Sequence, residues 1–249
     1  MENELIIGRN AVLEALRAKR EMNKIWISEN AHGSQMKELI DLAKRSGALV
    51  QFVPKKRLDA LAATANHQGV VASVAAYEYK TIDDLFHIAE SRNEPPFFLL
   101  LDGIEDPHNL GSILRTADCT GVHGVIIPRR RSVGLTAAVA KASTGAIEYV
   151  PVVRVNNLAQ TMEQLKERGI WFIGTDAKGE QDFREAEYTL PICIVIGSEG
   201  KGISRLVKEK CDFLVKLPMR GKVTSLNASV AAALCMYEAM RKRYPLKGG

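Results

Sequence analysis

The chain has 249 residues, of which 46% are hydrophobic and 25% charged, so the length fits one large domain or two small ones. The composition is near the globular average and excludes intrinsic disorder, collagen-like repetition and a disulfide scaffold. A formal net charge of +5 allows a nucleic-acid partner but does not establish one.

The first 80 residues alternate between helical and extended patterns. Val12, Leu13 and Leu16 have helical spacing, with Asn10 as a possible N-cap. The alternation predicts a compact α/β/α sandwich. Strands are expected at residues 24–29, 48–54 and 70–79, with further helices at 35–47 and from residue 55 onwards.

A locally acidic stretch separates this part from the rest of the chain. It contains a helical pattern, TIDDLFHIAE, and ends in Pro95-Pro96. We therefore expect a domain over residues 1–76, a linker over 77–96 and a second domain over 97–249.

The second domain repeats strand then helix, so its class is α/β. Apolar runs such as FFLLL and ICIVI suggest strands buried on both faces, hence a mostly parallel sheet. We expect strands at FFLLLD, GVIIP, YVPVVRV, IWFIGTD, ICIVIG and FLVKLP, and helices over 110–121, 135–144, 157–168, 202–209 and 226–242.

The cysteines and the N-terminal segment indicate where in the cell the protein is expected. No C-x-x-C pair or histidine cluster is present, so we expect no metal, and apolar patterns around Cys193 and Cys235 predict buried, reduced thiols. MENELIIGRN lacks a basic start followed by an apolar core, and no apolar run is long enough for a bilayer. We expect a cytoplasmic protein with no membrane partner.

Three polar segments follow strands of the second domain, where ligands of open parallel sheets gather. In the first, DPHNLGSILRTA, Asn109 can cap a helix that carries Arg115; a solvent-facing arginine is the alternative. The second, IGSEGKGI, is glycine-rich but lacks the spacing of a phosphate loop, and Glu199 would repel phosphate. In the third, LPMRGKVTSLNASVAAA, Ser225 or Asn227 is either an N-cap or a site residue.

Together, in this order and spacing, these segments resemble the three motifs of the SpoU, or TrmH, family of RNA ribose 2′-O-methyltransferases, a branch of the SPOUT superfamily. The match covers residues 106–117, 196–203 and 217–233. The N-terminal part resembles the substrate-binding domain of these enzymes, which is similar to ribosomal proteins that bind kinked RNA. The pair of domains is most similar to the RlmB-like subgroup, which methylates a guanosine ribose in the peptidyl-transferase region of 23S rRNA.

This resemblance implies a deep trefoil knot in the second domain, a homodimer with its site near the subunit interface, and S-adenosylmethionine as cofactor. By similarity, backbone groups at Gly197, Leu217 and Leu226 contact the cofactor. General topology rules treat knots as nearly absent, so periodicity alone favours a Rossmann-like sheet. The expected partners are 23S rRNA, or an assembling large ribosomal subunit, and a second copy of the chain.

Arg115 matches the catalytic arginine of the family. Because a guanidinium stays protonated at ordinary pH, we expect Arg115 to bind the target phosphate and position the 2′-oxygen rather than act as a simple base. Asn109 is expected to orient Arg115 or the nucleotide. Glu199 is expected to hold Arg115 or to accept the proton. Ser225 and Asn227 are expected to contact the hydroxyl or fix the loop.

Several basic residues near these segments are candidates for RNA contact, although a solvated loop is the alternative for the triplet 129–131. Asn10 is equally a candidate for RNA contact or for a helix cap. The candidates are Arg129, Arg130, Arg131, Lys201, Arg205, Arg220, Lys222, Arg9, Asn10, Lys55, Lys56 and Arg57.

Other functions remain open at this point. The motifs do not separate a 23S rRNA enzyme from one that modifies tRNA or another rRNA nucleotide. A non-catalytic RNA-binding assembly factor is a rival, although intact Asn109, Arg115, Glu199, Ser225 and Asn227 argue against it.

Overall fold

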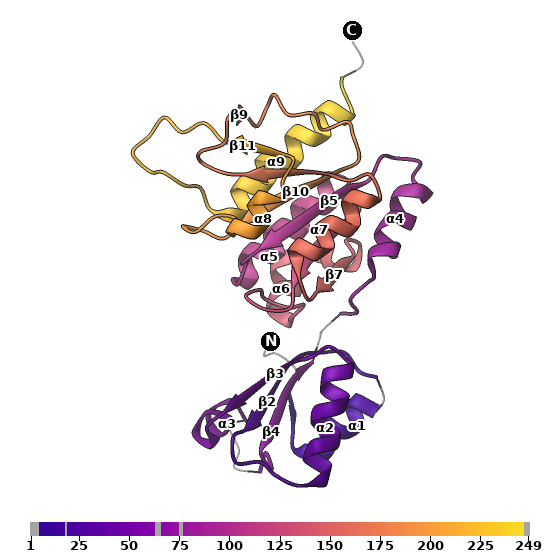
Figure 1. Cartoon of the computed structure of the whole chain (residues 1–249), viewed down its shortest axis with the longest axis vertical. Helices are drawn as coiled ribbons and strands as arrows, with labels where there is room; N and C mark the ends of the chain where they lie inside the picture. The colour runs from indigo at the N-terminus through magenta and orange to yellow at the C-terminus, as the bar shows by residue number, and fades with distance from the viewer. Residues whose placement is uncertain (1–4, 18, 63–65, 75–76, 247–249) are drawn as a thin grey trace. The chain divides into compact units, whose positions relative to one another are not determined.

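The computed structural model describes residues 5–17, 19–62, 66–74 and 77–246. The chain divides into two compact units, shown in Figure 1. One holds Met1–Glu78 with Gly134–Ala138, and the other holds Tyr79–Val133 with Val139–Gly249. The domain boundaries predicted from the sequence stay a prediction.

The N-terminal unit is built on a four-stranded sheet in the order β1-β4-β2-β3. β2 and β3 are parallel, whereas β4 runs antiparallel to both β1 and β2. The strands are β1 (Leu5–Ile7), β2 (Met22–Ser28), β3 (Leu49–Val53) and β4 (Val70–Val74). The short β1 was missed in the sequence, where its residues read as the approach to a helix.

Helices cover both faces of this sheet, which confirms the α/β/α sandwich. α1 (Arg9–Arg17) and α2 (Ser34–Arg45) bury their apolar residues with β2 and β4 on one face. α3 (Lys55–Ala62) packs on the other face over Val53 and Val71. The suggestion that Asn10 caps the first helix is wrong, because α1 already begins at Arg9.

The stretch expected to link the domains contains a folded helix, α4 (Ile82–Ser91). Thr81 and Asp84 form a capping box at its start. Leu85 and Phe86 enter the core of the second unit, and the Phe86 ring meets Phe98 edge to face with centroids 5.2 Å apart. The stretch therefore contributes to packing as well as connecting.

The second unit holds a seven-stranded sheet in the order β7-β6-β5-β10-β8-β11-β9, and every neighbouring pair is parallel. This confirms the prediction of a mostly parallel α/β sheet. The two-residue β9 was missed, because so short a strand leaves no period in the sequence. The strands are β5 (Phe97–Asp102), β6 (Gly124–Pro128), β7 (Val152–Val155), β8 (Trp171–Thr175), β9 (Gln181–Asp182), β10 (Ile192–Gly197) and β11 (Phe213–Lys216).

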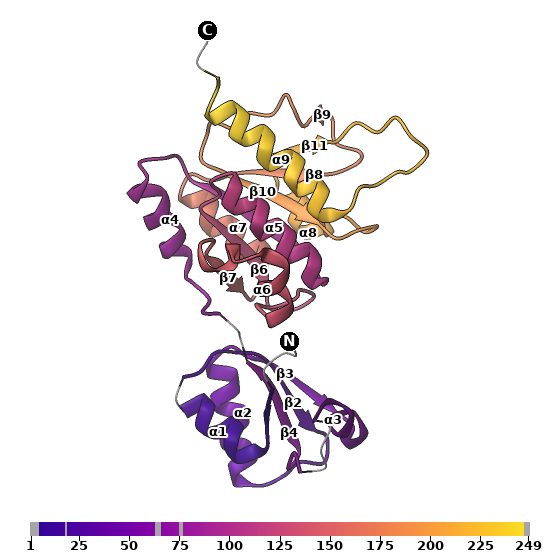
Figure 2. The ribbon, with the colours of Figure 1, turned by 180° about the vertical axis from the view of Figure 1, so that it is seen from behind.

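Helices flank this sheet on both sides. Figure 1 shows α7 (Leu158–Glu167) and α8 (Arg205–Glu209) in front of it, and Figure 2 shows α5 (Pro107–Cys119) and α9 (Ala228–Arg243) on the opposite face. The short α6 (Ala137–Ser143) follows β6 along the chain. Within the described ranges, no helix combines the length and apolar character that a membrane span requires.

Two details of the helix ends bear on the site. The helix α5 is capped by Asp106, whose carboxylate accepts the amide of His108, so the prediction that Asn109 caps it is wrong. α9 is capped by Asn227, one of the two residues considered.

Both Cys193 and Cys235 are fully buried, as predicted.

Candidate active site

Four neighbouring parallel strands end at one edge of the seven-stranded sheet. β5, β10, β8 and β11 lie side by side, so the loops that follow Asp102, Gly197 and Lys216 meet there. The Asp102 carboxylate accepts a 2.7 Å hydrogen bond from the Ser204 amide, which ties the end of β5 to the start of α8. The three polar segments of the sequence are thus brought together.

The loop after β10 is closed by its own backbone. Ser198 and Gly202 exchange two backbone hydrogen bonds of 3.1 and 2.8 Å, and Gly200 and Gly202 adopt φ values of +79° and +66°. A Cβ atom on Gly197 would lie 2.1 Å from the carbonyl carbon of Gly202. Only glycine fits at Gly197, because backbone crosses where a side chain would begin.

Glu199 joins the three segments through one carboxylate oxygen. Its Oε1 accepts hydrogen bonds from Nδ2 of Asn109 at 2.9 Å and from Nδ2 of Asn227 at 2.6 Å. The backbone amide of Ala228 adds a third bond at 3.2 Å, and Asn227 Nδ2 also donates to Asn109 Oδ1 at 2.9 Å. We call Asn109, Glu199 and Asn227 the triad.

Asn227 is held on its other side by α9. Its Oδ1 accepts from the amides of Ser229 and Val230 at 2.9 and 3.3 Å and from the Ser229 hydroxyl at 2.6 Å. The Asn227 side chain therefore caps α9 through its Oδ1 and joins the triad through its Nδ2. The orientation of Asn227 is fixed before any ligand arrives.

A cavity of about 910 Å³ opens beside the triad. Its volume is in the range of small-molecule sites, which is about 300–1,000 Å³. The predicted cofactor residues Gly197, Leu217 and Leu226 line it, as do Ser225 and Glu199. The loop after β8 forms a further wall, contributed by residues 175–178.

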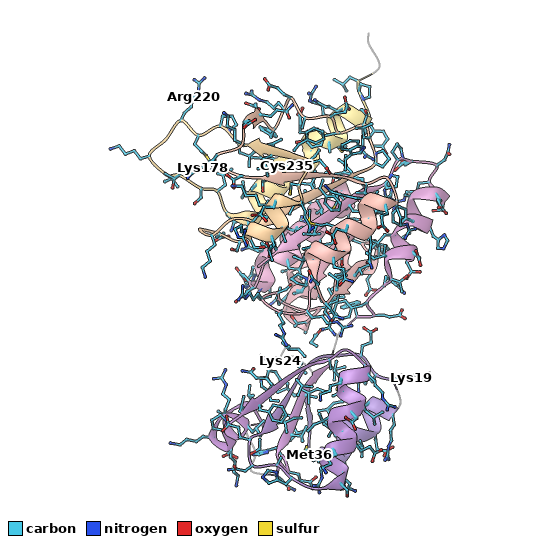
Figure 3. The ribbon with its side chains drawn as sticks, in the orientation of Figure 1. Lys19, Lys24, Met36, Lys178, Arg220 and Cys235 are labelled. Carbon is cyan, nitrogen blue, oxygen red and sulfur yellow. The ribbon has the colours of Figure 1, made fainter. Side chains whose placement is uncertain are left out.

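Charged groups on that wall are partly balanced. Asp176 forms a 2.6 Å ion pair with Lys208 and accepts the amide of Lys178 at 2.8 Å. Burial alone would raise the pKa of Asp176, but the hydrogen bonds from Lys208 and Lys178 outweigh it and lower the pKa. Figure 3 labels Lys178 here and shows Arg220 on the long loop before α9, pointing into solvent. The cavity thus has both carboxylates and lysines at its rim.

Arg115 lies apart from the triad. It is exposed on α5, and its side chain forms no hydrogen bond or ion pair with the residues that the structure describes. Beside it, a groove of about 340 Å³ runs between α5 and α9. The side chains of Val230, Leu234 and Tyr237 in this groove are 45%, 42% and 50% exposed. Its other lining residues are Ser112, Thr116, Ser229 and Ala233.

Comparison with known families settles the class of the protein. The sequence model of the SpoU rRNA methylase family matches residues 96–237, more than half of the chain. The chain belongs to the SpoU rRNA methylase family. A second model, for RNA 2′-O ribose methyltransferase substrate binding, matches residues 5–80. The SpoU motifs and the substrate-binding region are thus found in the order that the sequence predicted.

Individual SpoU relatives agree over almost the full length. A putative TrmH family tRNA/rRNA methyltransferase, YacO of Bacillus subtilis (strain 168), is 61% identical over 98% of both chains. A protein of the same description from Staphylococcus haemolyticus is 54% identical, again over 98% of both. The SpoU methyltransferase AviRb of Streptomyces viridochromogenes, solved with AdoMet, is 27% identical, with a TM-score of 0.61 over 96% of this chain and 90% of that chain.

Within the SpoU unit, the structure brings together most of the predicted site residues but not all. Asn109, Glu199 and Asn227 touch one another, and Ser225 lines the adjoining cavity. The side chains of Asn109 and Glu199 bond to each other and to Asn227 rather than to Arg115, so their expected roles toward Arg115, the nucleotide or the proton stay predictions. The wall after β8 was not among the predicted site residues, although a polar Thr175-Asp176 pair at a strand end is the signal that marks it.

Proposed function

We propose that the protein transfers a methyl group from S-adenosylmethionine to a ribose 2′-hydroxyl of RNA, with a guanosine in the peptidyl-transferase region of 23S rRNA as the favoured target. The observation that carries this proposal is the triad, which joins all three motif segments beside a cavity at the carboxyl edge of a parallel sheet. Family membership and the AdoMet complex of AviRb support the same reaction.

The residues around the cavity fit this cofactor. A phosphate-bearing ligand would meet the Glu199 carboxylate, whereas a cation or a neutral group suits it. Gly197 lines the cavity where its loop closes on itself, and Leu217 and Leu226 offer main-chain groups with apolar side chains. We therefore assign cofactor contacts to Gly197, Leu217 and Leu226.

When bound, the cofactor supplies a sulfonium methyl group for in-line attack by the ribose oxygen. The chain must then hold that oxygen in line and help its proton to leave. Arg115 holds the target phosphate through its fork of N–H donors. The triad fixes the loops around the cavity, and Ser225 at its rim contacts the ribose hydroxyl.

The geometry of α5 supports an active site shared between two copies of the chain. Arg115 lies six residues after Asn109, which places it about 9 Å farther along the helix axis and on a different side of the helix. The exposed apolar groove between α5 and α9 lies beside Arg115 and suits a second copy of the same surface. We infer a homodimer in which each protomer lends Arg115 to the cavity of its partner.

Substrate RNA would then approach a basic rim. Lys201 lines the cavity, and Arg205, Arg220 and Lys222 lie in or after its loops. The exposed Arg130 and Arg131 follow β6 at the same edge of the sheet. These cations suit phosphate contacts, and an RNA substrate of this kind places the enzyme in the cytoplasm.

The related proteins carry names that include both tRNA and rRNA, so a tRNA ribose is the second candidate target. Tritium transfer from labelled S-adenosylmethionine into purified rRNA and tRNA tests the reaction and separates the two. Mapping of 2′-O-methyl groups in RNA from a strain without this protein then locates the nucleotide. Absence of transfer to either RNA, with the folded protein present, contradicts the proposal and favours a non-catalytic RNA-binding factor.

A further inference from the structure

One face of the four-stranded sheet in the N-terminal unit is only partly covered by its helix. α3 buries Val53 and Val71 at one end of this face. Trp26 of β2 pairs with the exposed Gln51 of β3, and Gln51 and Val53 share a face because strand residues alternate. Lys24 lies on the same face, two residues before Trp26, and Figure 3 labels it.

Two cations border this uncovered part, Lys24 on β2 and the exposed Arg57 on α3. The Lys24 ammonium is 5.3 Å from the centroid of the Trp26 ring. Burial and the nearby charge of Arg57 together lower the pKa of Lys24. Neither Lys24 nor Arg57 forms an ion pair with a carboxylate among the described residues.

The opposite face of the same unit shows the contrast. There, Arg17 on α1 pairs with Glu14 at 2.7 Å and with Glu38 at 2.6 Å. The hydrogen bonds that Arg17 donates to Glu38 and Glu14 raise the pKa of Arg17. A cation on the α1 and α2 side is therefore neutralised within the protein, whereas Lys24 and Arg57 repel each other.

Lys24 is half-buried and Arg57 is exposed, and neither charge is neutralised by a carboxylate that the structure describes, so an arriving anion would be attracted to both. A single-stranded nucleic acid, which carries phosphates at regular spacing and exposed bases, matches the chemistry of these side chains. Two cations suit neighbouring phosphates, the Trp26 ring suits stacking, and the Gln51 amide can bond to a base or a 2′-hydroxyl. The exposed Lys55 and Lys56 at the start of α3 extend the charge beyond the patch.

We propose that Lys24, Trp26, Gln51 and Arg57 form a contact surface for a single-stranded segment of the RNA substrate. Lys24 and Arg57 hold two phosphates, Trp26 stacks on a base and Gln51 reads a base edge or a ribose. The proposal rests on the RNA methyltransferase function proposed above, and it names the part of the N-terminal unit that holds the RNA.

The test compares two double variants of the full-length protein with equal loss of charge. Lys24→Gln with Arg57→Gln removes the cations of the patch, and Lys37→Gln with Lys44→Gln removes two exposed lysines of α2 on the opposite face. Binding of a fluorescein-labelled 20-nucleotide oligouridylate is followed by anisotropy over a salt series. Methyl transfer to protein-free 23S rRNA and tRNA is measured alongside.

Affinity falls as salt rises, with a slope of log affinity against log salt of about −0.7 for each phosphate contact to a single strand. Because the patch variant loses two such contacts, we expect its slope to be shallower by about 1.4. Its KM for RNA rises while kcat and cofactor affinity stay at wild-type values, and the α2 variant changes neither slope nor KM. Lys24→Arg with Arg57→Lys, which keeps both charges, retains wild-type binding. In a Trp171→Phe background, the oligonucleotide quenches the remaining tryptophan fluorescence.

Equal slopes and equal KM values for the two double variants would overturn the proposal, as would a wild-type protein that does not bind the oligonucleotide. Loss of binding by the charge-keeping variant would also count against it, because the contact would then not be electrostatic. If the oligonucleotide binds through the patch but no RNA is methylated, the proposed function is contradicted. The proposal that the patch binds single-stranded RNA would still stand.

Discussion

The side-chain amide of Asn109 donates a 2.9 Å hydrogen bond to the carboxylate of Glu199, 90 residues later in the chain. The same oxygen accepts the amide of Asn227, so one atom connects the loops after β5, β10 and β11. Because three N–H donors surround Oε1 of Glu199, we expect this side chain to position the three segments rather than to accept a proton. The consequences can be measured.

Replacing Glu199 should lower kcat by an amount that depends on whether the new side chain can accept hydrogen bonds. Glu199→Gln keeps an acceptor oxygen but loses the charge, which makes its hydrogen bonds roughly half as strong. We expect a loss in kcat of about tenfold for Gln and at least 100-fold for Ala. The acidic limb of the pH–rate profile should persist in Glu199→Gln; its disappearance would make Glu199 the general base. Glu209→Gln on α8, which also removes an exposed carboxylate, should leave kcat unchanged.

Gly197→Ala should abolish cofactor binding. Its methyl group would lie 2.1 and 2.2 Å from backbone atoms of Gly202 and Ile203, which cannot retreat without opening the loop. Titration calorimetry with S-adenosylmethionine measures the loss, which we expect to exceed tenfold. Gly221→Ala is the matched control for steric clash at the same cavity, because a Cβ there meets no protein atom within 4 Å. Wild-type affinity in Gly197→Ala would show that the loop does not shape the cofactor site.

Arg115→Ala should abolish methyl transfer while S-adenosylmethionine still binds. The exposed position of Arg115, away from the triad, makes its contribution to the partner's cavity testable by mixing. Co-expression of Arg115→Ala with Asn227→Ala forms hybrid dimers that hold one complete site. The mixture should regain about a quarter of wild-type activity if the sites are shared. No recovery would place Arg115 in the cavity of its own chain, and near-normal turnover of Arg115→Ala would remove it from the mechanism.

The groove between α5 and α9 should hold the dimer together. The double substitution Leu234→Glu with Tyr237→Glu places two charges in an apolar contact. We expect this variant to sediment as a monomer in sedimentation velocity and to lose methyl transfer. The control is Leu206→Glu on α8, a side chain that is 57% exposed and outside the groove. A dimer that persists with both glutamates would locate the interface elsewhere.

Stability should fall below neutral pH because of His123. This side chain is fully buried, its Nδ1 accepts the amide of Phe97 at 3.0 Å, and its Nε2 donates to Glu94 at 2.9 Å. Burial lowers the pKa of His123 from its ordinary 6.5; the Glu94 bond and charge oppose this, while the charges of Arg92 and Arg243 add to it.

A folded-state pKa below the unfolded value means that the unfolded chain binds the proton first. The stabilisation from neutral His123 is complete above pH 6.5 and declines below it, by at most about 1.4 kcal/mol per pH unit. Urea denaturation between pH 8 and 5 measures this slope. His123→Gln can keep both hydrogen bonds without titrating, so it should flatten the slope between pH 6.5 and 5. An unchanged slope would assign the effect to another group.

Patterns within single elements were readable from the sequence. The apolar run ICIVIG was predicted as a buried strand and is one, with Ile192 to Val195 completely enclosed. The three loops of the site could also be located, because polar residues interrupt the chain where strands end. Features that depend on a partner far along the chain were not readable.

Two features of the site show what the sequence could not supply. Asp106 and Asn109 are both good helix caps; Pro107 at the first helical position is a local signal for Asp106, whereas the bond from Asn109 to Glu199 cannot be read from the sequence. The polar Thr175-Asp176 pair marks a strand end in the sequence, but the ion pair of Asp176 with Lys208, a residue of α8, cannot be read from it. Such pairings are set by tertiary packing, which local propensity does not encode.

The hydrogen bond between Asn227 and Asn109 spans 118 residues, and its later member caps the final helix. During synthesis, the chain therefore leaves the ribosome with most of its sheet translated but without the contact that completes the triad. Only when α9 has emerged and docked can all three side chains meet. A chain that terminates before α9 lacks Asn227 and cannot complete the triad, so we expect unfinished copies not to methylate RNA.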